Sequence, residues 1–374
     1  MSALAYIGCL TQPTPYFPAA HGTGIAVCRF DAESGRLEQI GDCTDIANPT
    51  WLTIDSTGRT LFACSEVFEW PEGRVTAYRI ADNDGRLIKL GEQPSQGSIA
   101  AYAHLDRSET RLLVANYSLD APNRGQEHGI AVFPVEADGS LGRVSARLSH
   151  DRFPLGPNPA RQERPHAHAV LPSPDNHFLL VADLGVDCVF CYRFDAVAGE
   201  VAAEPVAVLS LAPGAGPRHL VFHPHGHRLF VINELDSTVA ALGFDSASGD
   251  LMLRQCVSTL PPKFAAASDA CAIALTPDGH FLYATNRGHD SIAIFAVDPA
   301  SGSLEARGHV PCGGRTPRCL TIDPTGRFAL VANQNSDNVT VFSIDPTNGA
   351  LTSIGAPLAI GTPMSIAFRR SSKD

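Results

Sequence analysis

One phrase recurs along the chain and restricts the folds that are open to it. It consists of a hydrophobic run, a turn that contains proline, and a second hydrophobic run that ends in Asn or Asp. Its clearest copies are VLPSPDNHFLLVAD, VFHPHGHRLFVIN, ALTPDGHFLYATN and TIDPTGRFALVAN. Short hydrophobic runs bounded by turn residues predict antiparallel strands. A unit of this kind buries its hydrophobic faces only by stacking against its neighbours, so the repeat predicts a ring or an array.

Each copy continues into two further strands. Segments such as DSTVAALGFD, DSIAIFAVD and DNVTVFSID alternate hydrophobic and polar residues, and a glycine turn then leads to a fourth strand. These turn glycines occur seven times, at Gly35, Gly85, Gly139, Gly199, Gly249, Gly302 and Gly349. Four antiparallel strands per unit, repeated seven times, predict an all-β fold. We expect a seven-bladed β-propeller, formed as a single domain by residues 1–374.

The two ends of the chain complement each other. The C-terminal TPMSIAF supplies only a first strand, whereas the N-terminal LAYIGCL and GIAVCRFD supply later strands. Pairing of the two ends would complete the last blade and remove an open sheet edge. The main irregular insert runs from Arg147 to Pro165, before the third phrase. A loop of this length between strands favours a functional role.

The net charge of the chain limits the kinds of molecule that it can bind. The 374 residues carry a formal net charge of −11, which argues against nucleic acid and against anionic membrane surfaces. An anionic substrate would therefore need a local basic cluster. The chain has no apolar run long enough to span a membrane, and its N-terminus lacks the pattern of a signal peptide. We expect a cytoplasmic protein with reduced cysteines, either a monomer or a weak homodimer.

The repeated phrase places two residues of every unit on one rim of the disc. The first strand begins at this rim and the second strand ends there, while the proline turn lies on the opposite rim. The positions on the first strand are Thr50, Ala101, His168, Arg218, Cys271, Arg318 and Met364. Those after the second strand are Glu66, Tyr117, Leu184, Glu234, Arg287, Gln334 and Cys9. The residue type at these positions varies from unit to unit although the rest of the phrase is regular, which indicates that they form a functional site on a repeated structural framework.

The third, fourth and fifth units bring charged residues together on this rim. They are His168, Arg218, Glu234 and Arg287, with Arg318 as a possible third cation. Arginine binds carboxylate or phosphate through parallel hydrogen bonds, and Glu or His can take a proton from water. We predict a catalytic site for an anionic substrate, with a structural salt bridge as the alternative. The residues predicted to contact the substrate are His166, Arg318, Glu66, Asn233 and Asn286.

Other motifs are weaker candidates. Cys188 and Cys191 form a CxxC within a strand, where alternation places them on opposite faces. The histidines of HPHGH, residues 223–227, lie on the opposite rim, where we expect solvated side chains. His166 and His168 could bind a metal from one side of a strand, but the neighbouring arginines would oppose a cation. The chain has neither a Gly-x-Ser-x-Gly elbow nor a dinucleotide loop, and we predict no metal and no cofactor.

At these residues the sequence resembles the seven-bladed propeller lactonase family. That family includes bacterial 6-phosphogluconolactonases of the propeller type and the fungal 3-carboxy-cis,cis-muconate lactonising enzyme. The resemblance covers essentially the whole chain and is most specific at GPRH and NEL, residues 216–219 and 233–235. It implies a metal-independent enzyme. It also implies that His168 is the catalytic histidine, with Arg218, Glu234 and Arg287 matching the family's two arginines and its glutamate.

One departure from the family lies near the N-terminus. In YIGCLT, Cys9 stands where the resemblance implies threonine or another small polar residue. The departure concerns contacts with the substrate and leaves the predicted fold unchanged.

The resemblance implies hydrolysis of a six-membered sugar lactone, above all 6-phosphogluconolactone to 6-phosphogluconate. Arg218 and Arg287 would hold the anionic end of the substrate or stabilise the oxyanion. Glu234 and His168 would share the roles of base and acid, and the sequence leaves their order open. A muconate-type cycloisomerase would use the same arginines on carboxylates. A non-catalytic propeller scaffold would instead expose an apolar patch and tolerate loss of the cluster.

Overall fold

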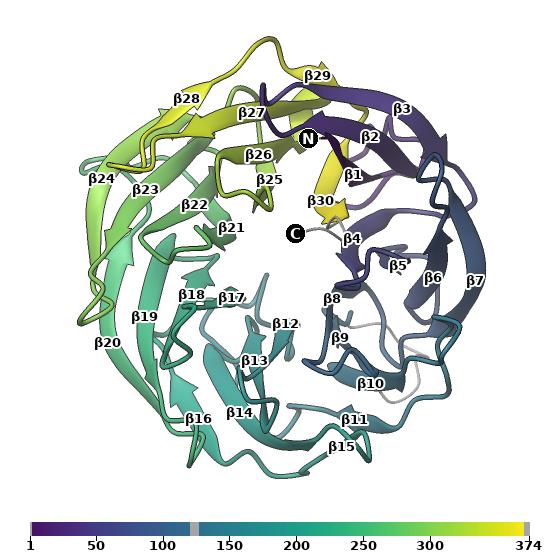
Figure 1. The fold of residues 1–374 in the computed structure, drawn as a ribbon. Coiled ribbons are helices and arrows are strands. Elements are labelled where there is room, and N and C mark those ends of the chain that lie inside the picture. Colours follow the sequence, from purple (N-terminus) through teal and green to yellow (C-terminus); the bar gives the residue numbers. More distant parts are fainter. Residues whose placement is uncertain (1, 120–126, 370–374) are drawn as a thin grey trace.

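Seven antiparallel sheets form a ring in the computed structural model, which describes residues 2–119 and 127–369 (Figure 1). We number the blades 1 to 7 in chain order of their innermost strands. Blade 1 contains β4 (Pro49–Ile54), β5 (Thr60–Ser65), β6 (Arg74–Ile80) and β7 (Leu87–Pro94). Blade 2 contains β8 (Ala100–Leu105), β9 (Arg111–Asn116), β10 (Ile130–Pro134) and β11 (Ala146–Leu148). Blade 3 contains β12 (Ala167–Pro172), β13 (Phe178–Asp183), β14 (Cys188–Asp195), β15 (Glu200–Val201) and β16 (Ala207–Ser210).

The other four blades follow the same order from the axis outwards. Blade 4 contains β17 (Pro217–Phe222), β18 (Arg228–Asn233), β19 (Thr238–Phe244) and β20 (Leu251–Ser258). Blade 5 contains β21 (Asp269–Leu275), β22 (Phe281–Arg287), β23 (Ser291–Val297) and β24 (Leu304–Pro311). Blade 6 contains β25 (Pro317–Ile322), β26 (Phe328–Asn333), β27 (Asn338–Ile344), β28 (Leu351–Ser353) and β29 (Leu358–Ala359), with the short 3-10 turn η1 (Gln334–Ser336). Blade 7 contains β30 (Pro363–Arg369), β1 (Ser2–Cys9), β2 (Ile25–Asp31) and β3 (Leu37–Cys43).

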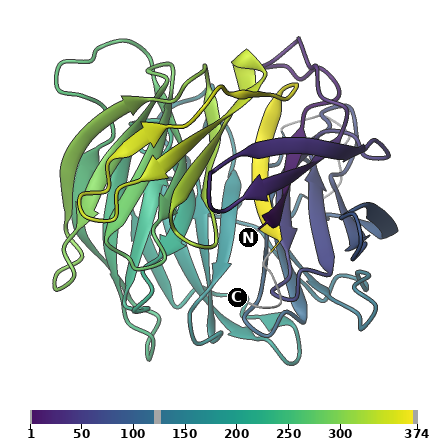
Figure 2. The same cartoon turned by 45° about the horizontal axis from the view of Figure 1, so that its top comes forward.

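The predicted closure is confirmed in blade 7. The C-terminal strand β30 lies innermost and pairs with β1, and Ile7 is opposite Ile366 in this register. Figure 2 shows the yellow C-terminal strand beside the purple N-terminal strands. The first and last segments of the chain therefore share one sheet, and the ring has no open edge between them.

The prediction of an all-β, seven-bladed propeller is confirmed, with two local differences. In blades 3 and 6 the outermost strand is divided into two short segments, and each segment pairs with the third strand. The irregular insert before blade 3 begins later than predicted, because Arg147 belongs to β11. The irregular segment between β11 and β12 therefore begins at residue 149, and we call residues 149–165 the insert loop.

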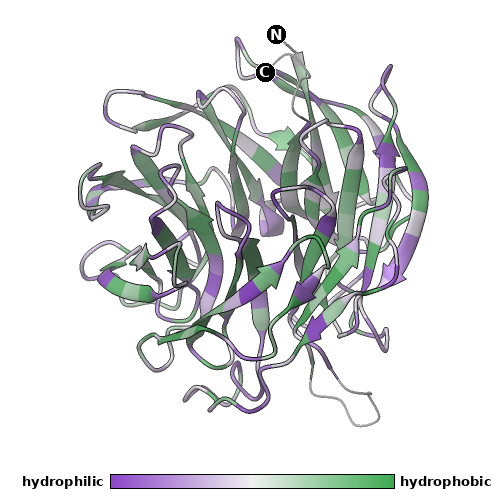
Figure 3. Cartoon of the chain, turned by 60° about the horizontal axis from the view of Figure 1, so that its bottom comes forward, coloured by the Kyte–Doolittle hydropathy of each residue, from purple (hydrophilic) through white to green (hydrophobic). Residues whose placement is uncertain are grey.

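Hydrophobic side chains fill the space within and between the blades. Figure 3 shows green along the inner strands and purple on the connecting turns. The turn glycines lie where neighbouring blades touch. Gly249 has a φ of +82°, and an added Cβ would lie 2.7 Å from the ring of Phe178 in the adjacent blade. Similarly, the hydroxyl of Tyr283 donates to the carbonyl of Gly349 at 2.9 Å. Each turn is thus a contact between blades, which explains why glycine recurs there.

Candidate active site

Every innermost strand is irregular where it begins, and this irregularity builds the site. In blade 4, Pro217 is opposite Asn233 and His219 is opposite Ile232, so Arg218 has no partner on β18. The other blades shift register at the same position, at Thr50, Ala101, His168, Cys271, Arg318 and Met364. A residue in a bulge leaves the regular alternation of the strand. Most of these side chains meet at the axis, around a constriction of about 20 Å³.

A larger cavity of about 720 Å³ adjoins this constriction. His168, Glu66 and Arg318 line both spaces. The remaining charged and aromatic residues of the cavity are Tyr16, Phe68, Tyr117, Arg161, Glu163, Glu234, Asp269 and Arg287. Another groove, of about 750 Å³, runs along β19 and β20 on the outside of the ring and contains none of the predicted site residues.

Glu234 is the centre of the charged cluster. Its side chain is 2% exposed, and its Oε2 accepts a hydrogen bond from Arg218 Nε at 2.8 Å. The other carboxylate oxygen lies 3.0 Å from Arg287 Nη2 and accepts a hydrogen bond from Arg161. Burial would raise the pKa of Glu234, but the charges of the three arginines hold this pKa well below its usual range. Three guanidinium groups therefore share one ionised carboxylate.

Arg161 was not predicted, because it lies in the insert loop and not at a repeated position. This loop is fixed to blade 3. Nδ1 of His150 lies 2.7 Å from Asp183 Oδ2, and both side chains are buried. The amide nitrogen of Gln162 donates to Asp187 Oδ1 at 2.8 Å. The irregularity of the segment 149–165 was the only signal in the sequence, and it pointed to a functional loop without identifying the residue.

Arg218 and His168 lie deeper than the other charged groups. Besides Glu234, Arg218 donates to the carbonyl of Cys271 at 2.7 Å, and it lines the constriction but not the larger cavity. His168 is 6% exposed, and its ring meets those of Tyr117 and His219 edge-on. Burial, followed by the charge of Arg218, holds the pKa of His168 well below its usual value of 6.5. Its imidazole is therefore neutral at pH 7.

Arg318 belongs to a second, smaller cluster on the opposite side of the constriction. Its Nη2 lies 3.8 Å from Glu66 Oε2, and its guanidinium lies 5.1 Å from the centre of the Tyr16 ring. The hydroxyl of Tyr16 donates to the same Glu66 oxygen at 3.0 Å. Arg318 therefore lines the cavity, as does Glu66, and its role as a further cation for the substrate stays a prediction. The third guanidinium at Glu234 is that of Arg161.

Three residues that we predicted as substrate contacts do not line the cavity. The ring of His166 stacks on Tyr117 with centroids 4.1 Å apart, and its Nδ1 lies 2.7 Å from the Tyr117 carbonyl oxygen. The bulge at His168 also means that the two histidines do not follow simple strand alternation. Asn233 donates to Thr238 Oγ1 at 2.8 Å, and Asn286 donates to the carbonyl of Thr259 at 2.7 Å. These asparagines tie the second strand to its surroundings, which explains their recurrence in the repeat.

The position assigned to Cys9 is also corrected. Cys9 is opposite Pro363, as Asn333 is opposite Pro317 in blade 6, so it occupies the Asn/Asp position of the phrase. The residue equivalent to Glu234 in blade 7 is therefore Leu10, which is fully buried. Blade 7 contributes no polar side chain at this position.

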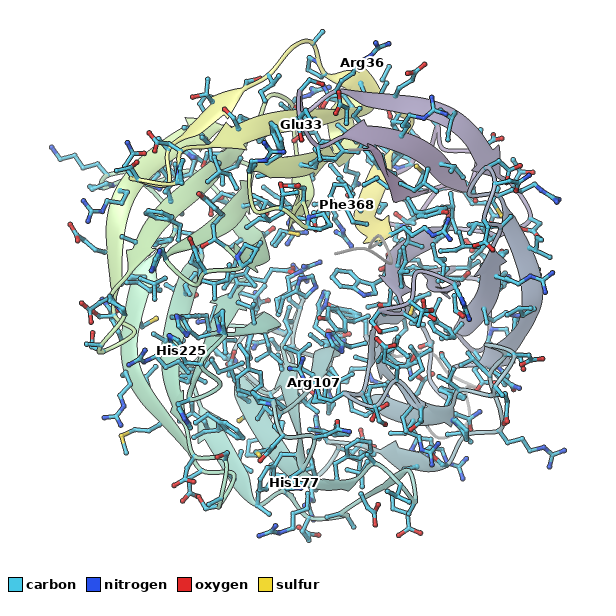
Figure 4. All side chains as sticks on the ribbon, in the orientation of Figure 1. Glu33, Arg36, Arg107, His177, His225 and Phe368 are labelled. Atoms are coloured by element: carbon cyan, nitrogen blue, oxygen red, sulfur yellow. The ribbon has the colours of Figure 1, made fainter. Side chains whose placement is uncertain are left out.

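Metal-binding side chains do not gather in the described part of the chain. Across residues 2–119 and 127–369, no group of three His, Cys, Asp or Glu residues is arranged to hold a metal ion. His225, on the proline turn between β17 and β18, lies away from the axis (Figure 4). In the same residues, no helix has the length and apolar character needed to cross a membrane.

Comparison with known proteins identifies the family to which this fold belongs. Residues 4–368 match the family described as "Lactonase, 7-bladed beta-propeller". The chain is 33% identical over 321 residues to the 6-phosphogluconolactonase of Bacillus subtilis, covering 86% of this chain and 85% of that protein. Among solved structures, a periplasmic gluconolactonase of Pseudomonas aeruginosa matches with a TM-score of 0.88 and 34% identity over 99% of both chains. A putative 6-phosphogluconolactonase of Bacteroides fragilis matches with a TM-score of 0.86 and 29% identity over 98% of both chains.

Proposed function

Because this chain belongs to the seven-bladed β-propeller lactonase family, we propose that it hydrolyses the ring ester of an aldono-1,5-lactone, with 6-phosphogluconolactone as the main substrate. One observation carries the proposal. A neutral His168 and an ionised Glu234 held by three guanidinium groups lie in one cavity of about 720 Å³. Ester hydrolysis needs a proton acceptor for water and positive charge for the developing oxyanion, and this cavity contains both.

We assign the base to His168 and not to Glu234. Both oxygens of the Glu234 carboxylate already contact guanidinium groups. Among the described residues, His168 Nδ1 is buried and has no hydrogen-bond partner, so this nitrogen is available to accept a proton from water. Water attacks the lactone carbonyl carbon while His168 takes its proton. The carbonyl oxygen becomes an oxyanion beside Arg287, and Glu234 fixes the direction of that guanidinium. As the bond from carbon to the ring oxygen breaks, His168 returns the proton to that oxygen.

The local charge at Glu234 supports a substrate that carries a phosphate, because three positive guanidinium groups there outnumber the one negative carboxylate that they contact. Two of the similar proteins are also named as 6-phosphogluconolactonases. A second candidate substrate is the unphosphorylated gluconolactone. It is favoured by the four carboxylates that line the cavity, Glu66, Glu163, Glu234 and Asp269, and by the similar gluconolactonase. The cytoplasmic location stays a prediction, since that relative is periplasmic.

The test is acid release from freshly generated 6-phosphogluconolactone, gluconolactone and a muconolactone, with and without chelator. We expect chelator-insensitive hydrolysis of the phosphorylated lactone that is lost in His168→Gln. The control is His225→Gln, on the opposite rim, which should keep the wild-type rate. Turnover of the muconolactone alone would favour the cycloisomerase. Rates equal to spontaneous hydrolysis on all three compounds would contradict the proposal and favour the scaffold.

A further inference from the structure

The three arginines at Glu234 differ in how far they reach toward solvent. The side chain of Arg218 is 4% exposed, that of Arg287 is 14% exposed and that of Arg161 is 35% exposed. Arg218 lines only the constriction, whereas the other two line the cavity. The cluster therefore runs from the axis to the mouth of the cavity, and Arg161 is its outermost member.

Arg161 has more donors than its contacts among the described residues use. A guanidinium has five N–H donors, and the hydrogen bond that this one gives within residues 2–119 and 127–369 goes to Glu234. Glu234 does not depend on Arg161 for neutralisation, since Arg218 and Arg287 already contact its two oxygens. The charge of Arg161 is therefore more than Glu234 needs, and its side chain lines the cavity.

The insert loop holds Arg161 in place before any ligand arrives. The buried pair of His150 and Asp183 fixes its beginning. Gln162, the residue next to Arg161, is 1% exposed and donates to the carbonyl of Leu184 and to Asp187, each at 2.8 Å. A donor that is already fixed loses little conformational entropy when it binds, which favours a specific contact.

We propose that Arg161 binds the phosphate group of a phosphorylated sugar lactone and thereby sets the preference for phosphorylated over unphosphorylated substrate. The inference rests on the proposed lactonase function. With the reacting carbonyl between His168 and Arg287, the far end of the substrate points toward the mouth, where Arg161 lies. Glu163 and Asp269 also line the cavity and oppose an anion, so the phosphate needs this guanidinium.

The experiment compares Arg161→Gln and Arg161→Lys with wild type on 6-phosphogluconolactone and on gluconolactone. The matched control is Arg152→Gln, because Arg152 lies in the same insert loop but pairs with Glu204 on the outside, where both side chains are at least half exposed. We expect Arg161→Gln to lose about tenfold to a hundredfold in kcat/KM on the phosphorylated lactone, the range given by hydrogen bonds to charged groups. The loss should lie mainly in KM and should be at least several times larger on the phosphorylated lactone than on gluconolactone. Arg161→Lys should fall between the two, since it keeps the charge without the planar fork.

A binding measurement separates this inference from the proposed function. Titration calorimetry measures the affinity for 6-phosphogluconate and for gluconate. Comparing the two affinities measures recognition of the phosphate without any hydrolysis. Binding of 6-phosphogluconate that weakens in Arg161→Gln supports the inference even if no lactone is hydrolysed, in which case only the proposed function fails. Equal losses on both lactones would overturn the inference, because Arg161 would then act only through Glu234. Unchanged kinetics and unchanged binding of 6-phosphogluconate would overturn it as well.

Discussion

Replacing Glu234 by Gln preserves the shape of the side chain and removes the negative charge that three arginines share. Arg218, which is 3% exposed, is then a buried cation without a counter-ion. Removing one partner of a buried ion pair costs about 3–5 kcal/mol. With an unfolding entropy of about 2.1 cal/mol/K per residue, the 374-residue chain has a total of roughly 0.8 kcal/mol/K. We therefore expect the Tm of Glu234→Gln to fall by about 4–6 °C.

Thermal unfolding followed by calorimetry and circular dichroism measures this shift. The matched control is Glu66→Gln, at the equivalent position of blade 1, where a single arginine lies 3.8 Å from the carboxylate. Its Tm should fall by less than half as much. The double variant Glu234→Gln/Arg161→Gln should recover part of the loss, because it removes one of the mutually repelling cations. A Glu234→Gln protein as stable as wild type, or equal shifts for the two glutamate variants, would refute the reasoning.

Further predictions concern pH and the insert loop. Burial lowers the pKa of His104 from 6.5 to about 4, so the unfolded chain binds this proton first and stability falls as pH drops from 6.5 to about 4. In calorimetry across that window, His104→Gln should reduce the pH dependence of the free energy of unfolding by up to roughly 3 kcal/mol. Because the pKa of His168 lies well below 6.5, kcat/KM for gluconolactone should stay level between pH 8 and 6.5, and a loss with its midpoint near 6.5 would contradict a neutral base. In Gly185→Ala, the new Cβ would lie 1.9 Å from the Arg164 carbonyl oxygen, so the end of the insert loop must move and lactonase activity should fall. The control is Gly41→Ala, where the nearest atom lies 4.0 Å from the new Cβ and the activity should equal that of wild type.

The fold could be predicted from the sequence because each unit of the repeat predicts the same four-stranded structure. The proline turn, the glycine turn and the terminal Asn or Asp each have one structural role, and every copy reinforces the same register. Counting positions within the phrase also placed His168, Glu234 and Arg287 beside one cavity. The same counting failed at Cys9, because the last blade is assembled from both ends of the chain and its phrase is interrupted. The roles expected for Asn233 and Asn286 failed for a different reason, since their recurrence reflects strand anchoring.

Arg161 could not be found by the same means, because the insert loop has no counterpart in the other blades. Its position depends on tertiary contacts, namely those of His150 with Asp183 and of Gln162 with Asp187. Both contacts join residues more than twenty positions apart. Neither pairing follows from a period in the sequence, so only the folded chain shows that the loop supplies a cation to Glu234.

The bulges explain how one scaffold tolerates a charged site at its centre. In a regular inner strand, a side chain at the first position would have to face one of the two neighbouring blades, where apolar packing decides what fits. As the extra residue of a bulge, it turns toward the axis instead, and its identity is then free of the packing between blades. Arg218 and His168 can therefore stand where other blades carry Ala101 or Met364. On this reasoning, exchange of Ala101 for Ser should leave the Tm almost unchanged, while the same exchange at Ala103, which packs between blades and is 1% exposed, should lower it.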